Sequence, residues 1–172
     1  MKTARVLYHL ARADFLERVR RHSFLVVLAG TIYLGYAINH GDIYLELDGY
    51  RGVLNSAWVG GLMTASAALL LTLFGFYLVK NTIARDIETG VGQIIATTPI
   101  SRPIYLLGKW LSNLAVLAAL LGLLALAAAV MQLLGGESSR LDLWALLSPF
   151  ILVSLPTLSV VAALAVLFES IG

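Results

Sequence analysis

Two carboxylates and a guanidinium stand close together in an otherwise apolar sequence. Asp86 and Glu88 lie beside Arg85 in the segment 80–110. Paired carboxylates act as general acid and base when both face one substrate. Residues two apart in a helix point to different faces, however, and charges on a helix surface are usually solvated. We therefore expect no acid–base chemistry from this pair.

The dipeptide Gly108-Lys109 has the residue types that end a phosphate-binding loop. In that motif a Ser or Thr follows the Lys, and a Gly opens the loop. Here Trp110 follows the Lys, and Pro103 stands in the place of the first Gly. The sequence therefore predicts no ATP binding by this route.

Histidine and cysteine add no further site. His9, His22 and His40 are scattered along the chain, too far apart in sequence to form the short-spaced ligand set typical of a metal site. The chain has no Cys, which excludes disulfides, thiolate metal ligands and Cys catalysis. We expect a chain that is not itself an enzyme, with no catalytic residue, no metal and no cofactor of its own.

Long apolar segments dominate the 172 residues, of which 59% are hydrophobic and 13% charged. No Asp, Glu, Lys or Arg occurs in four segments, 23–38, 58–79, 111–134 and 144–168. A helix needs about 20 apolar residues to cross a membrane, and the last three segments exceed that length. The pattern predicts an all-α fold: one polytopic membrane helix bundle, residues 1–172, with four transmembrane helices. It excludes a soluble enzyme and a nucleic-acid-binding protein.

Positive charges concentrate on alternate connections. Six of the 12 Lys and Arg residues precede the first apolar segment, four lie in 80–110, and the loops 39–57 and 135–143 carry one each. Because cytoplasmic segments carry the excess of Lys and Arg, the N-terminus and the loop 80–110 are predicted to be cytoplasmic. We expect the cell's inner, cytoplasmic membrane, with anionic lipid head groups as partners and no nucleic acid.

The segment 1–22 repeats apolar residues at helical spacing between basic ones. This pattern predicts an interfacial helix whose basic face meets lipid head groups. The first apolar segment, 23–38, has only 16 residues, so the core of a signal peptide is an alternative. The length of the leading segment, with Asp14 and Glu17 within it, argues against cleavage.

Small residues recur every four positions in the spans. Gly61 and Ala65 are one such pair, Gly60 and Thr64 form a parallel stripe, and Gly122 follows Ala118. This spacing lets helix backbones approach closely, so we expect Gly61, Ala65 and Gly122 in helix contacts. Pro156 predicts a kink in the last span, with Ser154, Thr157 and Ser159 available to satisfy the freed carbonyls. No ionisable side chain lies within a span, so proton-driven transport is not expected.

The loop 80–110 is long for a plain connection. Ile83 and Ile87 belong to an apolar stripe that continues through Val91, Ile94 and Ile95, and this stripe predicts an amphipathic helix with Arg85, Asp86 and Glu88 turned elsewhere. Gly90 and Gly92 weaken this helix, so either the helix breaks there or another segment packs closely against it. Ser101 is a suitable N-cap for a second helix that runs into the third span. A segment that simply lies on lipid is the alternative.

In this loop the sequence resembles the type 2 ATP-binding-cassette (ABC) transporter permeases. The resemblance rests on Arg85-Asp86-Ile87-Glu88-Thr89-Gly90, on Thr98-Pro99-Ile100-Ser101-Arg102 and on Tyr105-Leu106-Leu107-Gly108-Lys109. It implies that Arg85, Asp86, Glu88, Thr89 and Gly90 lie in or beside a coupling helix. It further implies that Thr98, Pro99, Ser101 and Arg102 shape the following turn, and that Tyr105, Gly108 and Lys109 return the chain to the membrane.

The resemblance also implies partners and an activity. Permeases of this family bind cytosolic ABC ATPase subunits through the coupling helix and pair with a second permease half, alike or different. ATP hydrolysis in the ATPase then drives alternating access, here expected to serve export. The family usually has about six spans per half, so this four-span chain looks like an N-terminal part of one. A membrane anchor, an assembly protein or a lipid-modifying membrane enzyme is the alternative.

Overall fold

The computed structural model describes residues 2–40, 53–90, 92–93, 97, 100–135, 137–138 and 140–171. Within these ranges the chain is helical and contains no strand. The elements in chain order are α1 (Lys2–Val19), α2 (His22–His40), α3 (Ser56–Val79), α4 (Thr82–Glu88), α6 (Arg102–Gly135), α7 (Leu143–Pro149), the π-helical turn η1 (Phe150–Ser154) and α8 (Leu155–Ile171).

Three stretches of the described chain are long and apolar enough to cross a membrane. They are Ser56–Glu88, Arg102–Gly135 and Leu143–Ile171, and they contain the last three predicted spans. The apolar part of α2, His22–Ala37, is shorter, so the first span stays a prediction. The expectation of an all-helical membrane protein is confirmed at this level.

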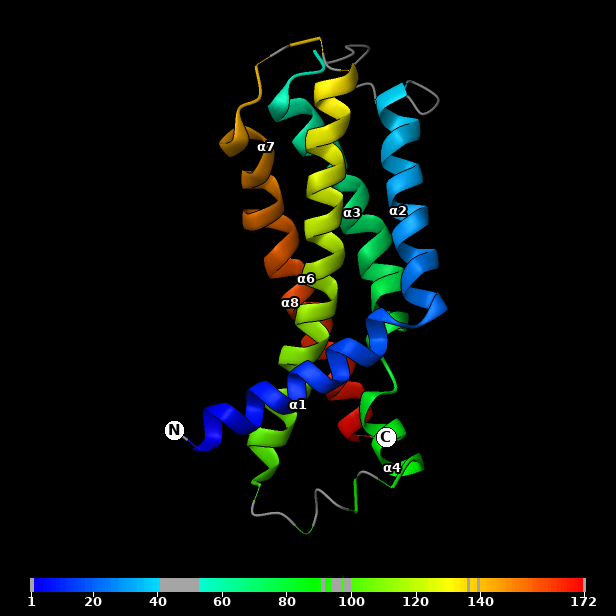
Figure 1. Ribbon diagram of the computed structural model, residues 1–172, viewed down its shortest axis with the longest axis vertical. Coiled ribbons are helices and arrows are strands. Elements are labelled where there is room, and N and C mark those ends of the chain that lie inside the picture. The colour runs from blue at the N-terminus through cyan, green and yellow to red at the C-terminus, as the bar shows by residue number, and fades with distance from the viewer. Residues whose placement is uncertain are drawn as a thin grey trace.

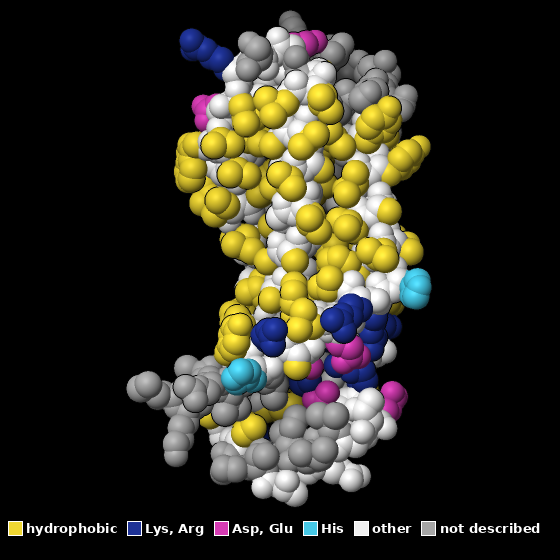
Figure 2. Space-filling view, viewed as in Figure 1, with side chains coloured by type: hydrophobic (Ala, Val, Ile, Leu, Met, Phe, Trp, Pro, Cys, Tyr) yellow, Lys and Arg dark blue, Asp and Glu magenta, His cyan; other side chains and the backbone are white. Residues whose placement is uncertain are grey.

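The long helices stand side by side, and α1 crosses them near one end (Figure 1). The chain turns between α1 and α2 through a bond from the Arg21 amide to the Arg18 carbonyl, 3.0 Å long. The short helix α4 lies at the same end of the bundle as α1. Hydrophobic side chains cover the body of the bundle, and charged ones gather over α1 (Figure 2).

The core forms where α3 packs against α6. Val59, Met63, Ala67 and Leu71 recur every four residues on α3 and are almost completely buried. Buried side chains of α6 complete this core, among them Leu117, Leu120, Leu124 and Ala128. Because lipid is as apolar as these side chains, close packing holds the helices together more than exclusion from water does.

The end of the bundle away from α1 is fixed by polar contacts. The Gln132 amide donates to the Ser56 hydroxyl at 2.7 Å, and the same hydroxyl oxygen accepts from the Asp142 amide at 2.8 Å. The Asp142 side chain also caps α7 by accepting from the amides of Trp144 and Ala145. These bonds join the beginnings of α3 and α7 to the end of α6.

Close helix approach occurs at a different glycine from the one expected. Gly61, Ala65 and Gly122 are exposed, and a Cβ added at either glycine would meet nothing within 4 Å. The prediction that these three residues mediate helix contacts is therefore wrong within this chain. Gly60 takes that place, because its added Cβ would lie 2.5 Å from the Leu146 carbonyl oxygen of α7. The α3 stripe that faces the bundle is the parallel one.

A π-helical turn precedes the proline of the last span. η1 occupies the five residues before α8, and Pro156 is the second residue of α8. A proline ring clashes with the carbonyl four residues before it, and a wider turn relieves that clash. The Thr157 hydroxyl donates to the Val153 carbonyl at 2.8 Å, whereas the carbonyl four residues before Pro156 is that of Leu152. The buried Ser154 hydroxyl, by contrast, has no partner among the described residues.

Replacing Gly60 by Ala tests the close approach of α3 and α7. The new methyl group would overlap the main chain of Leu146, so the two helices must separate, at a cost of about 1–3 kcal/mol in the free energy of unfolding. Gly61→Ala is the matched control, since both substitutions gain the same helix propensity. Thermal unfolding in mild detergent should show a lower midpoint for Gly60→Ala only. Equal midpoints would contradict this packing.

Candidate functional site

The helix α4 turns its polar side toward the protein. Thr82 and Asp86 are its buried residues, whereas Ile87 is 71% exposed. The sequence predicts that Asp86 is solvated and lies on a different face from the apolar stripe through Ile87. The expectation for Asp86 is wrong, because the buried face of α4 is the one that carries Asp86. Asn81 enters the helix with a φ of 65°, a left-handed conformation that Asn tolerates better than most residues. Gly90 follows the helix with a φ of 74°, as expected for a helix that ends there.

Lys109 lies at the centre of a polar cluster at this end of the bundle. The cluster consists of Asp14, Arg18, Thr82, Arg85, Asp86, Tyr105, Lys109 and Asn113. The Lys109 side chain is 1% exposed. Its Nζ lies 2.8 Å from Asp14 Oδ2 of α1 and 2.7 Å from Asp86 Oδ2 of α4. One ammonium of α6 therefore binds a carboxylate from each of two other helices.

Two further side chains neutralise and orient these carboxylates. The Tyr105 hydroxyl donates to Asp86 Oδ2 at 2.7 Å, one turn before Lys109 on α6. Arg85 Nη2 lies 3.4 Å from Asp14 Oδ1 and 3.0 Å from Glu17 Oε2. Buried carboxylates are costly unless they are paired and hydrogen-bonded, and both conditions are met here. Asp14 and Asp86 are thereby held in fixed positions.

Arg18 joins α1 to the beginning of the third span. Its guanidinium donates to Asn113 Oδ1 at 2.5 Å and to the Thr82 hydroxyl. Burial lowers the pKa of Arg18 to about 10, and the nearby carboxylate of Asp14 opposes this shift. The group therefore remains charged at neutral pH. The interfacial helix was expected to turn its basic face to lipid, and for Arg18 that expectation is wrong.

The last helix reaches the same region through Glu169. Its Oε2 accepts from the Ile83 amide at 2.6 Å. The first amides of a helix have no partner within the helix, so this carboxylate satisfies one of those of α4. Trp110 supplies a second contact to α8 by donating its Nε1 proton to the Ser159 carbonyl at 3.1 Å. The helices α1, α6 and α8 therefore all meet α4.

The structure brings together only part of the predicted site. Arg85, Asp86, Tyr105 and Lys109 belong to the polar cluster, Gly108 is buried beside it, and Glu88, Thr89, Ser101 and Arg102 are exposed. Ser101 precedes α6, and its carbonyl accepts from the Tyr105 amide at 3.1 Å. Thr98 and Pro99 lie outside the described residues. Val91, Ile94 and Ile95 of the predicted apolar stripe do as well.

Sequence reasoning missed Asp14, Arg18, Asn113 and Glu169. Asp14 and Arg18 are four residues apart and so lie on one face of α1, which was a usable signal. Asn113 was another, because it is the one amide in the first two turns of an apolar run. Glu169 carried no comparable signal, since it lies just beyond the last apolar segment, where a charge is ordinary.

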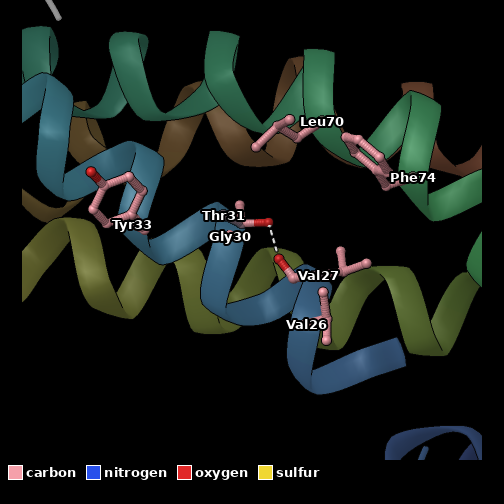
Figure 3. Close-up of a pocket in the computed structure, with 7 residues that line it drawn as sticks. All are labelled: Val26, Val27, Gly30, Thr31, Tyr33, Leu70 and Phe74. Atoms are coloured by element: carbon pink, nitrogen blue, oxygen red, sulfur yellow. Dashed lines mark hydrogen bonds between the residues drawn. The ribbon is translucent and has the colours of Figure 1, made fainter. Parts of the chain in front are cut away.

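A hollow without charged lining lies between α2 and α3. It has a volume of about 310 Å³ and is lined by Val26, Val27, Gly30, Thr31, Tyr33, Leu70 and Phe74 (Figure 3). The Thr31 hydroxyl donates to the Val27 carbonyl at 2.6 Å, so its proton is already used. This hollow therefore offers little to a polar ligand.

No protein family, no curated protein and no solved structure matches the chain. Among the described residues, no group of three potential metal ligands comes together. The cluster pairs opposite charges from separate helices, so it ties α1, α4 and α6 together.

Replacing Lys109 by Met tests the central ion pairs. The change leaves Asp14 and Asp86 buried without their ammonium, and loss of one partner from a buried pair costs about 3–5 kcal/mol. Arg102→Met on the same helix removes an exposed cation and serves as the control. Thermal unfolding in detergent should show a large loss for Lys109→Met and almost none for Arg102→Met.

The double variant Asp86→Asn, Lys109→Met separates charge from packing. Because it removes one buried carboxylate together with the ammonium and leaves Asp14 paired with Arg85, it should recover much of the stability lost in Lys109→Met. If Lys109→Met were as stable as Arg102→Met, the ion pairs would not hold this end of the bundle.

Proposed function

We propose that this chain is the permease subunit of an ABC transporter, with α4 as its coupling helix. It would lie in the cytoplasmic membrane with its N-terminus and α4 on the cytoplasmic side. A separate cytosolic ATPase binds α4, and ATP hydrolysis there drives export of a substrate through a bundle completed by a second permease half.

The observation that supports this proposal most is that α4 has two different sides. Asp86 and Thr82 attach one side to α1 and α6 through buried contacts. Ala84, Ile87 and Glu88 are exposed on the other. Ile87 lies eight positions beyond the apolar segment 58–79, so the proposed partner, and not the lipid around that segment, would cover it. A partner that grips this side therefore pulls on the whole polar cluster.

The polar cluster gives a route for this movement. A displacement of α4 carries Asp86, and Asp86 is bound to Lys109 at the start of the α6 span. Because Lys109 also holds Asp14, α1 must move with α6 or the ion pairs must break. Alternating access needs such a link between a soluble engine and the membrane helices.

The outer face of the bundle supports pairing with a second permease half. Gly61 and Ala65 are exposed on α3, and a Cβ added at Gly61 would meet no atom of the described residues within 4 Å. Small residues at this spacing allow another backbone to approach closely. The same residues therefore suit a contact with a helix supplied by a partner.

Substitution of Ile87 by Glu tests whether α4 binds an ATPase. The tagged protein is purified from its native membrane in mild detergent, and associated proteins are identified by mass spectrometry. We expect an ATPase with a phosphate-binding loop to accompany the unmodified chain and to be lost, at least ten-fold, with Ile87→Glu. Ile87 is 71% exposed, so the fold should be unaffected.

Leu107→Glu provides the control, because Leu107 is also exposed and receives the same new charge. It should retain the ATPase. Recovery of no ATPase at all with the unmodified chain would contradict the permease proposal and favour a membrane anchor.

Labelling of a single introduced thiol tests the side of the membrane. The chain has no Cys, so Thr89→Cys carries its only thiol, at an exposed position directly after α4. We expect a membrane-impermeant maleimide to label it only after the cells are permeabilised. Labelling in intact cells would place α4 outside and exclude an ATPase partner.

A further inference from the structure

An open groove runs between α1 and the first turns of the α6 span. Its volume is about 570 Å³, within the range of ligand sites. Phe15, Ala11 and Tyr8 of α1 line one side, and Leu111, Ala115 and Ala119 of α6 line the other. The alanines leave room for a ligand because their side chains end at Cβ. The groove is almost wholly apolar, with one exception.

That exception is Arg12, which lines the groove from α1 and is exposed. Among the described residues, the ion pairs of α1 are made by Asp14, Glu17 and Arg21, and Arg12 has none. Asp14, which lies two positions further along α1, is already bound to Lys109 and Arg85. Arg12 is therefore a cation beside an apolar groove without an anion of its own.

The position of the groove restricts what can fill it. On α6 it begins at Leu111, two positions after Lys109, where the apolar run of α6 starts. Figure 2 shows the charged side chains over α1 next to the hydrophobic surface of the bundle. A ligand here must present an apolar chain to the alanines and an anionic group to Arg12. A membrane phospholipid with a net negative head group has both parts.

We propose that the groove between α1 and α6 binds one anionic glycerophospholipid. An acyl chain lies along Phe15, Ala115 and Ala119, and the phosphate accepts hydrogen bonds from the Arg12 guanidinium. Such charge-assisted bonds are among the stronger polar contacts in proteins, and Arg suits phosphate because its donors form a planar fork. The bound lipid braces α1 against α6 in addition to the ion pairs of Lys109. This site does not depend on the transporter function.

The hollow between α2 and α3 provides a comparison within the same chain. It is also open and apolar, but no charged residue lines it. An acyl chain alone fits either site, whereas a preference for an anionic head group is expected only where Arg12 is present. The two sites therefore separate head-group recognition from general lipid contact.

Native mass spectrometry of the purified full chain in mild detergent tests the proposal. The protein is titrated with dioleoyl-phosphatidylglycerol or with dioleoyl-phosphatidylcholine, which have the same acyl chains. We expect the first phosphatidylglycerol to bind about ten-fold more tightly. Both lipids offer a phosphate to Arg12, but the choline group of phosphatidylcholine brings a second cation close to the guanidinium and offsets that attraction. Arg12→Gln should abolish this preference, and Ala115→Leu, which fills the groove, should weaken the binding of the first lipid of either kind.

Two control variants complete the experiment. Arg20→Gln removes the same charge from an exposed position that does not line the groove. Gly30→Leu fills the hollow between α2 and α3. Both should keep the preference for phosphatidylglycerol. Circular dichroism verifies that each variant is folded, and Arg12→Gln decides the outcome even if Ala115→Leu is unstable.

Several results would overturn the proposal. Equal binding of the two lipids to the unmodified chain would show that the groove does not select an anion. Equal losses for Arg12→Gln and Arg20→Gln would show a general effect of net charge. A dimer in detergent that Ala115→Leu converts to monomer would assign the groove to a second copy of the chain.

Discussion

The buried ammonium of Lys109 holds together the end of the bundle where α1, α4 and α6 meet. It binds Asp14 of α1 and Asp86 of α4 at 2.8 Å and 2.7 Å. Without it, two carboxylates would lie in a poorly solvated region without compensation, and such a charge is among the most costly features of a fold. The crossing position of α1 and the inward face of α4 both follow from this requirement.

The apolar spans could be predicted from the sequence because charge is excluded from them. The segments 58–79, 111–134 and 144–168 each lie within a long apolar helix of the structure. A helix end at Gly90 was one of two expected outcomes, because glycine weakens a helix interior, and the structure gives Gly90 a left-handed φ of 74° just after α4. Such features depend on the composition or the geometry of one short segment, and sequence reasoning handles them well.

The facing of the helices could not be predicted in the same way. In water, an apolar stripe marks the side of a helix that is buried. In a membrane, lipid and protein interior are equally apolar, so a stripe such as Gly61 and Ala65 does not reveal which side faces other helices. On α4 the rule for helices in water is reversed, because the charged Asp86 is buried and the apolar Ile87 is exposed. Contacts with residues far away in sequence decide this orientation, among them the pairing of Asp86 with Lys109, 23 positions away.

The wide turn η1 has a consequence for how the last crossing fits the bundle. Across α7, η1 and α8, a series of buried residues follows at intervals of four: Leu146, Phe150, Ser154, Leu158 and Ala162. In a regular α-helix, positions four apart drift sideways by about 40° per step, so such a series winds around the helix. On α3 a series at this spacing stays buried because several helices contact α3. A π-helical turn contains more residues than an α-helical turn, so four positions within it rotate by less than a full turn, and the drift is reversed. The wide turn η1, which Pro149 precedes and Pro156 follows, thus keeps the buried series from Leu146 to Ala162 directed at the other helices.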